Sequence, residues 1–218
     1  MDGAIARARS ERGELVLLRR GDAVELRVNG VFVMDTAHTG TERELAAATL
    51  RAVEGTDLRV LVGGLGLGFT LQEVLADPRV REAHVVEIEP DLLDWHRAGL
   101  VPQTAGVLRD DRVRCHVGDV AEVITAQPAG SVDVLLLDVD NGPGYLVLDA
   151  NAAIYRAGFL ARCAEKLSDG GTLAIWSADT SPELRAALEE VFGGCEERAI
   201  PVRLGRRETT YHLFLAVR

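Results

Sequence analysis

Residues 58–90 read LRVLVGGLGLGFTLQEVLADPRVREAHVVEIEP, and this stretch decides the fold. It predicts an apolar strand, a glycine-rich turn, a short helix and a second apolar strand that ends in an acid. The turn carries Gly63, Gly64, Gly66 and Gly68. Glycines let a ligand approach the backbone, and the following helix N-terminus offers free N–H groups. Glu87, 24 residues after Gly63, can accept both hydrogen bonds of a ribose diol. We therefore predict an adenine-nucleoside site rather than a purely structural turn.

Strands and helices continue to alternate after this stretch. The predicted strands are 58–63, 83–88, 112–116, 132–138 and 172–177, and the predicted helices are 67–76, 90–98, 119–126 and 151–167. Such alternation requires right-handed crossovers and a mostly parallel sheet. After a helix near 181–192, the runs 196–203 and 209–217 are joined by a turn alone and predict an antiparallel hairpin. This combination favours a doubly wound, methyltransferase-like (Rossmann-like) α/β fold over a nicotinamide-binding one.

The N-terminal part follows a different pattern. Residues 14–35 alternate apolar and polar side chains, interrupted at Gly21-Asp22 and at Asn29-Gly30. Asn-Gly between alternating runs is a strong hairpin signal, because both residues tolerate positive φ. We predict a three-stranded antiparallel meander there, followed by a helix over 41–54. The chain is thus expected to divide into a β-meander, residues 1–40, and a catalytic domain, residues 41–218.

Composition narrows the class of protein. A chain of 218 residues can bury a full core, and its net charge of −10 argues against a broad nucleic-acid surface. The N-terminus lacks the apolar core of a signal peptide, and no apolar run approaches the ~20 residues of a membrane span. Three cysteines without metal-ligand spacing suggest ordinary thiols in a reducing compartment. We expect a cytoplasmic protein that acts on a small molecule, with no metal, membrane or nucleic-acid partner.

Further acids follow the strands whose carboxyl ends should border the ligand. Asp119 could accept a hydrogen bond from an adenine amino group, could cap the helix that follows, or could do both. Asp138 ends the fourth predicted strand and could orient a nucleophile or take its proton, which we favour over a turn-forming role. Asp140, two residues later, is open between the two roles.

Three other side chains lie near this region of the predicted fold. Tyr145 and Tyr155 flank the loop after Asp138, and either could form a pocket wall or serve ordinary packing. His38 lies between the meander and the helix 41–54, from where it could lean over the site. A lone loop histidine is more often a surface residue than a catalyst.

In this order, the motifs resemble the spermidine synthase family, aminopropyltransferases built on a methyltransferase-like fold. The segments VGGLGLG (62–68), VVEIEP (85–90), HVGDV (116–120) and LLLDVDNGPG (135–144) are similar to its four site motifs. The resemblance implies that Glu87 binds the ribose, that Asp119 lies beside the adenine and that Asp138 is the catalytic acid. With Asp140 and Tyr145, which lie near it in the sequence, Asp138 makes up the candidate catalytic set.

The chain departs from that family at three places. The family commonly has an aspartate, which helps to hold the amine of the decarboxylated donor, where this chain has Gly66. Two like charges ~4 Å apart at an effective dielectric near 20 cost about 4 kcal/mol, so losing that acid predicts a preference for intact S-adenosylmethionine. The acceptor-binding pair Asp-x-x-Asp becomes Asp138 and Asn141, and the helix 41–54 lacks the family's aromatic-His-Glu cluster. These changes weaken the expectation of a putrescine acceptor.

Several functions remain open at this point. We expect an S-adenosylmethionine-dependent enzyme in which attack at the aminopropyl carbon releases methylthioadenosine, by transfer or by ring closure. The alternatives are a small-molecule methyltransferase, an ordinary putrescine aminopropyltransferase, and a non-catalytic nucleoside-binding paralogue. The joint presence of Glu87, Asp119 and Asp138 speaks against the last. Exposed edge strands of the meander predict a homodimer.

Overall fold

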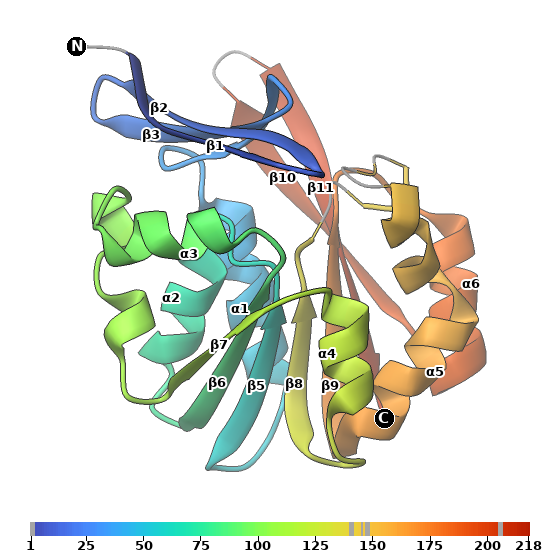
Figure 1. Cartoon of the computed structure of the whole chain (residues 1–218). Helices are drawn as coiled ribbons and strands as arrows, with labels where there is room; N and C mark the ends of the chain where they lie inside the picture. The colour runs from blue at the N-terminus through green and yellow to red at the C-terminus, as the bar shows by residue number, and fades with distance from the viewer. Residues whose placement is uncertain (1–2, 140–141, 145, 147–148, 205–206) are drawn as a thin grey trace.

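The strands of this chain form two separate sheets. The computed structural model describes residues 3–139, 142–144, 146, 149–204 and 207–218. A four-stranded sheet, here called the N-terminal sheet, precedes a seven-stranded sheet. Figure 1 shows the N-terminal sheet lying across one end of the larger α/β unit. No helix in the described ranges combines the length and apolarity needed to cross a membrane.

The N-terminal sheet is an antiparallel meander of β1 (Gly3–Ser10), β2 (Gly13–Arg20), β3 (Ala23–Val28) and β4 (Val31–Asp35). The three strands predicted within 14–35 are β2, β3 and β4. Asn29 and Gly30 both have positive φ, as the Asn-Gly turn requires. The prediction of only three strands was wrong, because β1 adds a fourth along β2. Its core-facing alanines have low β-propensity and gave no strand signal.

The larger sheet contains β5 (Leu58–Gly63), β6 (Val80–Glu87), β7 (Val113–Val117), β8 (Val132–Leu137), β9 (Leu167–Ser177), β10 (Glu196–Leu204) and β11 (Arg207–Val217). Its strand order is β10-β11-β9-β8-β5-β6-β7. The five strands β5 to β9 pair in parallel, whereas β10 and β11 form the predicted antiparallel hairpin on β9. The doubly wound fold with a terminal hairpin is confirmed.

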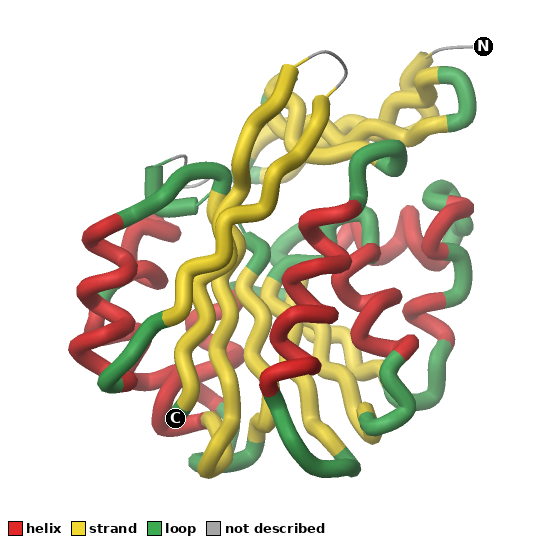
Figure 2. Tube along the Cα trace, turned by 180° about the vertical axis from the view of Figure 1, so that it is seen from behind, coloured by secondary structure: helices red, strands yellow, loops and turns green. Residues whose placement is uncertain are grey.

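Within the described residues there are six α-helices, and helices cover both faces of this sheet (Figure 2). They are α1 (Gly40–Ala52), α2 (Phe69–Ala76), α3 (Pro90–Arg97), α4 (Val120–Ala126), α5 (Ala157–Lys166) and α6 (Pro182–Phe192). The first three pack through one apolar cluster and the last three through another. The predicted helix 151–167 is divided between a 3₁₀ segment, Asp149–Tyr155, and α5. Likewise, β9 begins at Leu167 rather than at the predicted 172, with a register shift against β8.

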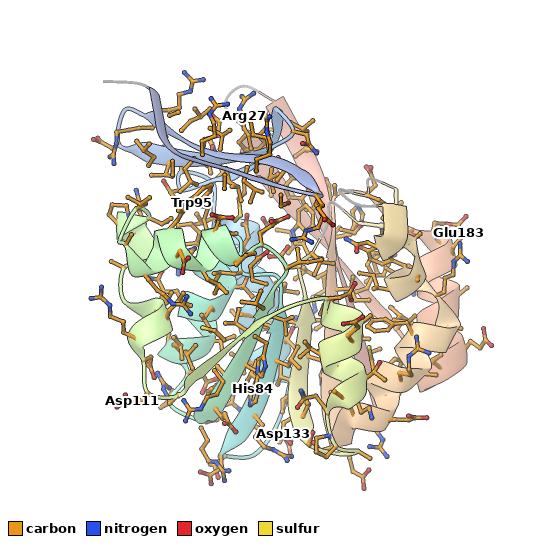
Figure 3. All side chains as sticks on the ribbon, in the orientation of Figure 1. Arg27, His84, Trp95, Asp111, Asp133 and Glu183 are labelled. Atoms are coloured by element: carbon orange, nitrogen blue, oxygen red, sulfur yellow. The ribbon has the colours of Figure 1, made fainter. Side chains whose placement is uncertain are left out.

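A third apolar cluster joins the N-terminal sheet to the α/β unit. Leu15, Leu17 and Leu26 pack against Leu92 and Trp95 of α3. Figure 3 shows Trp95 directly beneath the N-terminal sheet. This packing holds the sheet over the carboxyl ends of the parallel strands, where doubly wound folds bind their ligands.

Candidate functional site

A cavity of about 660 Å³ lies between the N-terminal sheet and the carboxyl ends of the parallel strands. Its size falls within the range of small-molecule pockets. Its floor includes Gly64, Gly66 and Val86, and its roof includes Leu26 and Phe32. The predicted nucleoside site and the predicted catalytic loop therefore open into one space.

The glycine-rich turn connects β5 to α2 at the floor of this cavity. Gly64 has φ +93°, and a Cβ there would lie 2.1 Å from the carbonyl oxygen of Asp138. Gly66 has φ +50°, and its Cβ would lie 2.7 Å from Sδ of Met34. Gly64 thus requires glycine for conformation and for space, whereas at Gly66 the positive φ favours glycine and the nearby Met34 side chain is flexible. Gly63 ends β5 and Gly68 precedes α2, and neither is among the cavity-lining residues.

Two polar side chains that are not part of the cavity lining hold this turn in place. The Nε2 atom of His96 lies 2.9 Å from the carbonyl oxygen of Gly66, and Oγ1 of Thr104 donates to the carbonyl of Leu67 at 2.8 Å. Burial lowers the pKa of His96, so the neutral imidazole donates from Nε2 to Gly66. The turn is thereby fixed before any ligand arrives.

Glu87 ends β6 with its carboxylate held by backbone donors. Leu65 N–H donates to Oε2 at 3.0 Å, and Glu89 N–H donates to Oε1 at 2.9 Å. Burial raises the pKa of Glu87, while these hydrogen bonds oppose the rise. Each oxygen keeps a further lone pair for a ligand hydroxyl. Because Glu87 also lines the cavity, its geometry fits the predicted ribose contact.

Asp119 combines both roles that the sequence left open. Its Oδ1 atom accepts a hydrogen bond from Ala121 N–H at 2.7 Å, so it is the N-cap of α4. It also lines the cavity, beside Gly118 and Val120. The capping role is confirmed, and the contact with an adenine amino group stays a prediction.

Asp138 follows β8 and is partly buried at the inner end of the cavity. Burial, followed by the charge of Glu42, raises its pKa to about 7, and a hydrogen bond from Thr70 opposes this. The Thr70 hydroxyl lies 3.2 Å from Oδ2 of Asp138 and 3.3 Å from the Glu42 carbonyl oxygen. The pKa of Glu42 is also raised, mainly by burial. Asp138 can therefore accept a proton and release it near neutral pH.

The cavity is strongly acidic, which the motifs alone did not reveal. Beyond the predicted acids, Asp35 at the end of β4, Glu42 in α1, Glu89 and Asp179 line it. Among the described lining residues, Arg12 is the only arginine or lysine. Its Nε donates to Oε1 of Glu89 at 2.7 Å, so that charge is already paired. The cavity thus favours ligands with positive charge. It holds more carboxyl groups than the sequence led us to expect when the acceptor-binding acids of the family were found to be changed.

The Arg12 contact also closes one side of the cavity. Arg12 and Ser10 belong to the β1–β2 hairpin, and both reach Glu89, which follows β6. Arg12 donates in addition to the Ile88 carbonyl at 3.0 Å. The N-terminal sheet is therefore tied to the α/β unit directly beside Glu87.

Two aromatic side chains form a wall of the same cavity. Trp176 of β9 and Tyr211 of β11 have ring centroids 4.9 Å apart at an interplanar angle of 60°. Trp176 belongs to the apolar cluster shared by α1, α2 and α3, and it also lines the cavity. Tyr155 is buried within the cluster under α5 and serves packing. The predicted candidates Asp140 and Tyr145 lie outside the described residues.

His38 is brought to the cavity by the segment between β4 and α1. Its Nδ1 atom lies 3.1 Å from both carboxylate oxygens of Asp35. Asp35 is fixed in turn by the backbone N–H groups of Ala37 and His38, at 2.9 and 2.8 Å. The imidazole lines the cavity while its side chain remains 41% exposed. It is thus more than the surface residue that a loop histidine usually is.

The chain is similar to proteins of a known family. The family model described as the spermine/spermidine synthase domain matches residues 48–190. The chain belongs to the spermine/spermidine synthase family. This match confirms the resemblance on which the residue roles were predicted.

Individual members of the spermine/spermidine synthase family show how far the likeness extends. Polyamine aminopropyltransferase 2 of Streptomyces coelicolor is 30% identical over 162 residues, which are 72% of this chain and 28% of that protein. Putrescine N-methyltransferase 4 of Nicotiana tabacum is 31% identical over 144 residues, 62% of this chain and 35% of that protein. The chain spans about half or less of the length of the curated relatives it matches.

Solved structures support the fold. Spermidine synthase from Thermotoga maritima superposes with a TM-score of 0.82 and 18% identity, covering 98% of this chain and 72% of that one. At this identity, the likeness establishes the architecture shared with spermidine synthases. The reaction has to be inferred from the residues of the site.

Proposed function

We propose that this protein is a transferase that binds an adenosyl sulfonium donor and directs an amine to the carbon on its aminopropyl side, releasing methylthioadenosine. The observation that carries the proposal is the acidic cavity, in which Glu87 and Asp119 lie at the nucleoside end. Asp35, Glu42, Asp138 and Asp179 supply further carboxyls, and Glu89 is paired with Arg12. A sulfonium and an alkylammonium are both cations, and carboxylates match both.

Asp138 is the proposed base. Aliphatic amines are protonated at neutral pH, and only the neutral amine attacks carbon. A carboxyl group with a pKa of about 7 can take that proton. Near neutral pH a sizeable fraction of it is ionised, and the ionised form is still basic enough to accept a proton. The amine nitrogen then bonds to the carbon, and the carbon–sulfur bond breaks with its electron pair moving to sulfur. Holding the two reactants in line contributes to the rate as well.

Two features of the site favour opposite donors, one the intact and the other the decarboxylated S-adenosylmethionine. Gly66 removes the family aspartate and favours intact S-adenosylmethionine, whose carboxylate an acid there would repel. The remaining lining acts in the opposite direction, because Arg12 is already paired with Glu89. A donor carboxylate would then enter a space rich in carboxyls, whose described lining offers it no unpaired arginine or lysine. We give this lining more weight, so the proposed donor is the decarboxylated form, and preference for the intact form stays the alternative that Gly66 predicts.

Methyl transfer is the second candidate. It is favoured by the 31% identity with putrescine N-methyltransferase 4, over 62% of this chain. Rotating the sulfonium by one substituent would present the methyl carbon to the same amine. The adenosyl product would then be S-adenosylhomocysteine instead of methylthioadenosine.

Calorimetry with each donor separates these alternatives. Tighter binding of decarboxylated than of intact S-adenosylmethionine is expected from the acidic lining. The order should reverse if Gly66 decides donor choice. Chromatography of the adenosyl product then distinguishes aminopropyl from methyl transfer, since the two reactions leave different thioethers.

The proposed assembly is a homodimer. β1 and β4 are the edges of the N-terminal sheet, and Val31 and Phe32 of β4 are 65% and 44% exposed. Unpaired edges with exposed apolar side chains invite pairing with another chain. Light scattering after size exclusion should give twice the chain mass, and a monomer mass would refute this assembly.

A further inference from the structure

The side chain next to Asp138 is set by the register of the large sheet. Leu137 of β8 pairs with Ile175 of β9, and Asp138 and Trp176 are the next residues along these two parallel strands. Both side chains lie on the sheet face that α1 to α3 cover, because Asp138 accepts from Thr70 of α2 and Trp176 belongs to the apolar cluster of those helices. Neighbouring strands lie about 4.8 Å apart. An amine held at Asp138 therefore has the indole ring as a close neighbour.

Trp176 and Tyr211 give this part of the cavity an aromatic wall. Their ring centroids are 4.9 Å apart, and only 8% of Trp176 is exposed. The buried Nε1 atom of Trp176 finds no hydrogen-bond acceptor among the residues that the structure describes. An indole nitrogen is only a donor, whereas an ammonium group needs acceptors. The indole thus offers a ligand apolar surface and no hydrogen bond for a second ammonium.

Beyond this wall, the β10–β11 hairpin extends past the end of β9. The pairing of β11 with β9 begins at His212, so residues 200–204 and 207–211, here called the overhang, pair with each other beyond the last residue of β9. Figure 1 and Figure 2 show the overhang rising beside the N-terminal sheet. Among its described residues, Val202, Thr209 and Tyr211 line the cavity, and none of the three is charged. The aromatic wall is therefore continued by uncharged side chains.

Two carboxyls of the described lining, Asp35 and Asp179, remain for a second cation. Asp35 already accepts hydrogen bonds from the backbone N–H groups of Ala37 and His38, and Nδ1 of His38 lies 3.1 Å away. Asp179 is exposed, so that water and salt screen its charge. A second ammonium lying along the wall would lose water without meeting a buried carboxylate of its own, and a ring face replaces only part of that hydration.

We infer that the acceptor is a primary amine with one cationic group and an apolar body, of the alkylamine or arylalkylamine class. This inference deepens the proposed function and rests on it, because it takes Asp138 as the group that receives the amine. The nitrogen lies at Asp138, and the apolar body follows Trp176 and Tyr211 toward Val202. Phe32 of β4 lines the same cavity and adds apolar surface. The bonds that form and break are those of the proposed transfer.

Comparing 2-phenylethylamine with putrescine tests the acceptor class. With the decarboxylated donor, kcat/KM for 2-phenylethylamine should exceed that for putrescine by at least about tenfold, because its ring is buried and no second ammonium is dehydrated. Calorimetry on protein saturated with methylthioadenosine should give the same order of affinities without any turnover. Putrescine equal to or better than 2-phenylethylamine in either measurement would overturn the inference.

Val202→Glu and its matched control Val202→Leu test the path of the apolar body. Val202→Glu adds a carboxylate that the second ammonium of putrescine can meet, so the ratio of the two kcat/KM values should shift toward putrescine by at least about fivefold. Val202→Leu keeps this lining apolar and should keep the order of the two amines. Methylthioadenosine affinity, measured for both variants, shows whether the nucleoside end is intact.

The outcomes separate the two proposals. An unchanged ratio in a Val202→Glu protein that binds methylthioadenosine as wild type does would contradict the inferred path. If the wild-type protein alkylates no amine at all, the proposed function fails, whereas the calorimetric order of the two amines still decides the acceptor class.

Discussion

Replacing Asp138 with asparagine should stabilise the free protein at alkaline pH while stopping turnover. The side chain is partly buried at the inner end of the cavity, and its pKa is about 7 in the folded state against 3.8 for the ordinary group. The folded protein therefore binds more protons than the unfolded chain between these two values. Stability falls as the pH rises through this window, because ionising Asp138 inside the fold is unfavourable.

The size of this effect follows from the two pKa values. Between pH 5 and pH 8, titration of Asp138 alone lowers the free energy of unfolding by about 3 kcal/mol. The asparagine variant lacks this titration. The difference in stability between variant and wild type should therefore grow by about 3 kcal/mol from pH 5 to pH 8.

Urea denaturation followed by circular dichroism at both pH values measures this difference. Glu42→Gln is the matched control, because it removes the neighbouring charge that helps to raise the pKa of Asp138. Its pH dependence should lie between those of wild type and the asparagine variant. A stability difference between Asp138→Asn and wild type that changes by less than about 0.5 kcal/mol from pH 5 to pH 8 would refute the reasoning.

Three further substitutions probe the cavity walls. Gly64→Ala places a Cβ 2.1 Å from the Asp138 carbonyl oxygen at φ +93°, so the free energy of unfolding measured by thermal denaturation should fall by at least about 2 kcal/mol. An unchanged melting temperature would contradict this packing. Glu87→Gln replaces one backbone-bound oxygen with an amide donor and should weaken methylthioadenosine binding at least about tenfold by calorimetry, whereas unchanged affinity would exclude the ribose role. Arg12→Ala leaves the Glu89 carboxylate without its ion pair, so limited proteolysis should cut the N-terminal sheet faster; wild-type cleavage rates would show that this contact does not hold the sheet.

The parallel core could be predicted from sequence because its signals are local. Buried strands such as Leu58–Gly63 and Val132–Leu137 are continuous apolar runs, and each is followed by a glycine or an acid at the ligand-binding edge. Strand β1 lacked such a signal, because it is held by its pairing with β2 rather than by an apolar run of its own. Its existence depends on a neighbour, which periodicity cannot report.

The residues of the candidate site likewise include some that could be predicted from the sequence and some that could not. Glu87, Asp119 and Asp138 were predicted because each follows a strand of the same sheet. Asp35 and Glu42 reach the cavity from the N-terminal sheet and from the first turn of α1. Their approach depends on how the N-terminal sheet folds over the α/β unit, which no spacing in the sequence encodes. The role of Glu42 was therefore missed, although it lies in the helix that was searched for acceptor-binding residues.

Identification of the adenosyl product tests the central proposal most directly. The purified protein would be incubated with decarboxylated S-adenosylmethionine plus putrescine, and separately with intact S-adenosylmethionine with and without putrescine. Chromatography should show methylthioadenosine, formed in the same amount as alkylated amine and most rapidly with the decarboxylated donor. S-adenosylhomocysteine from the intact donor, with no methylthioadenosine in any mixture, would contradict attack at the aminopropyl carbon.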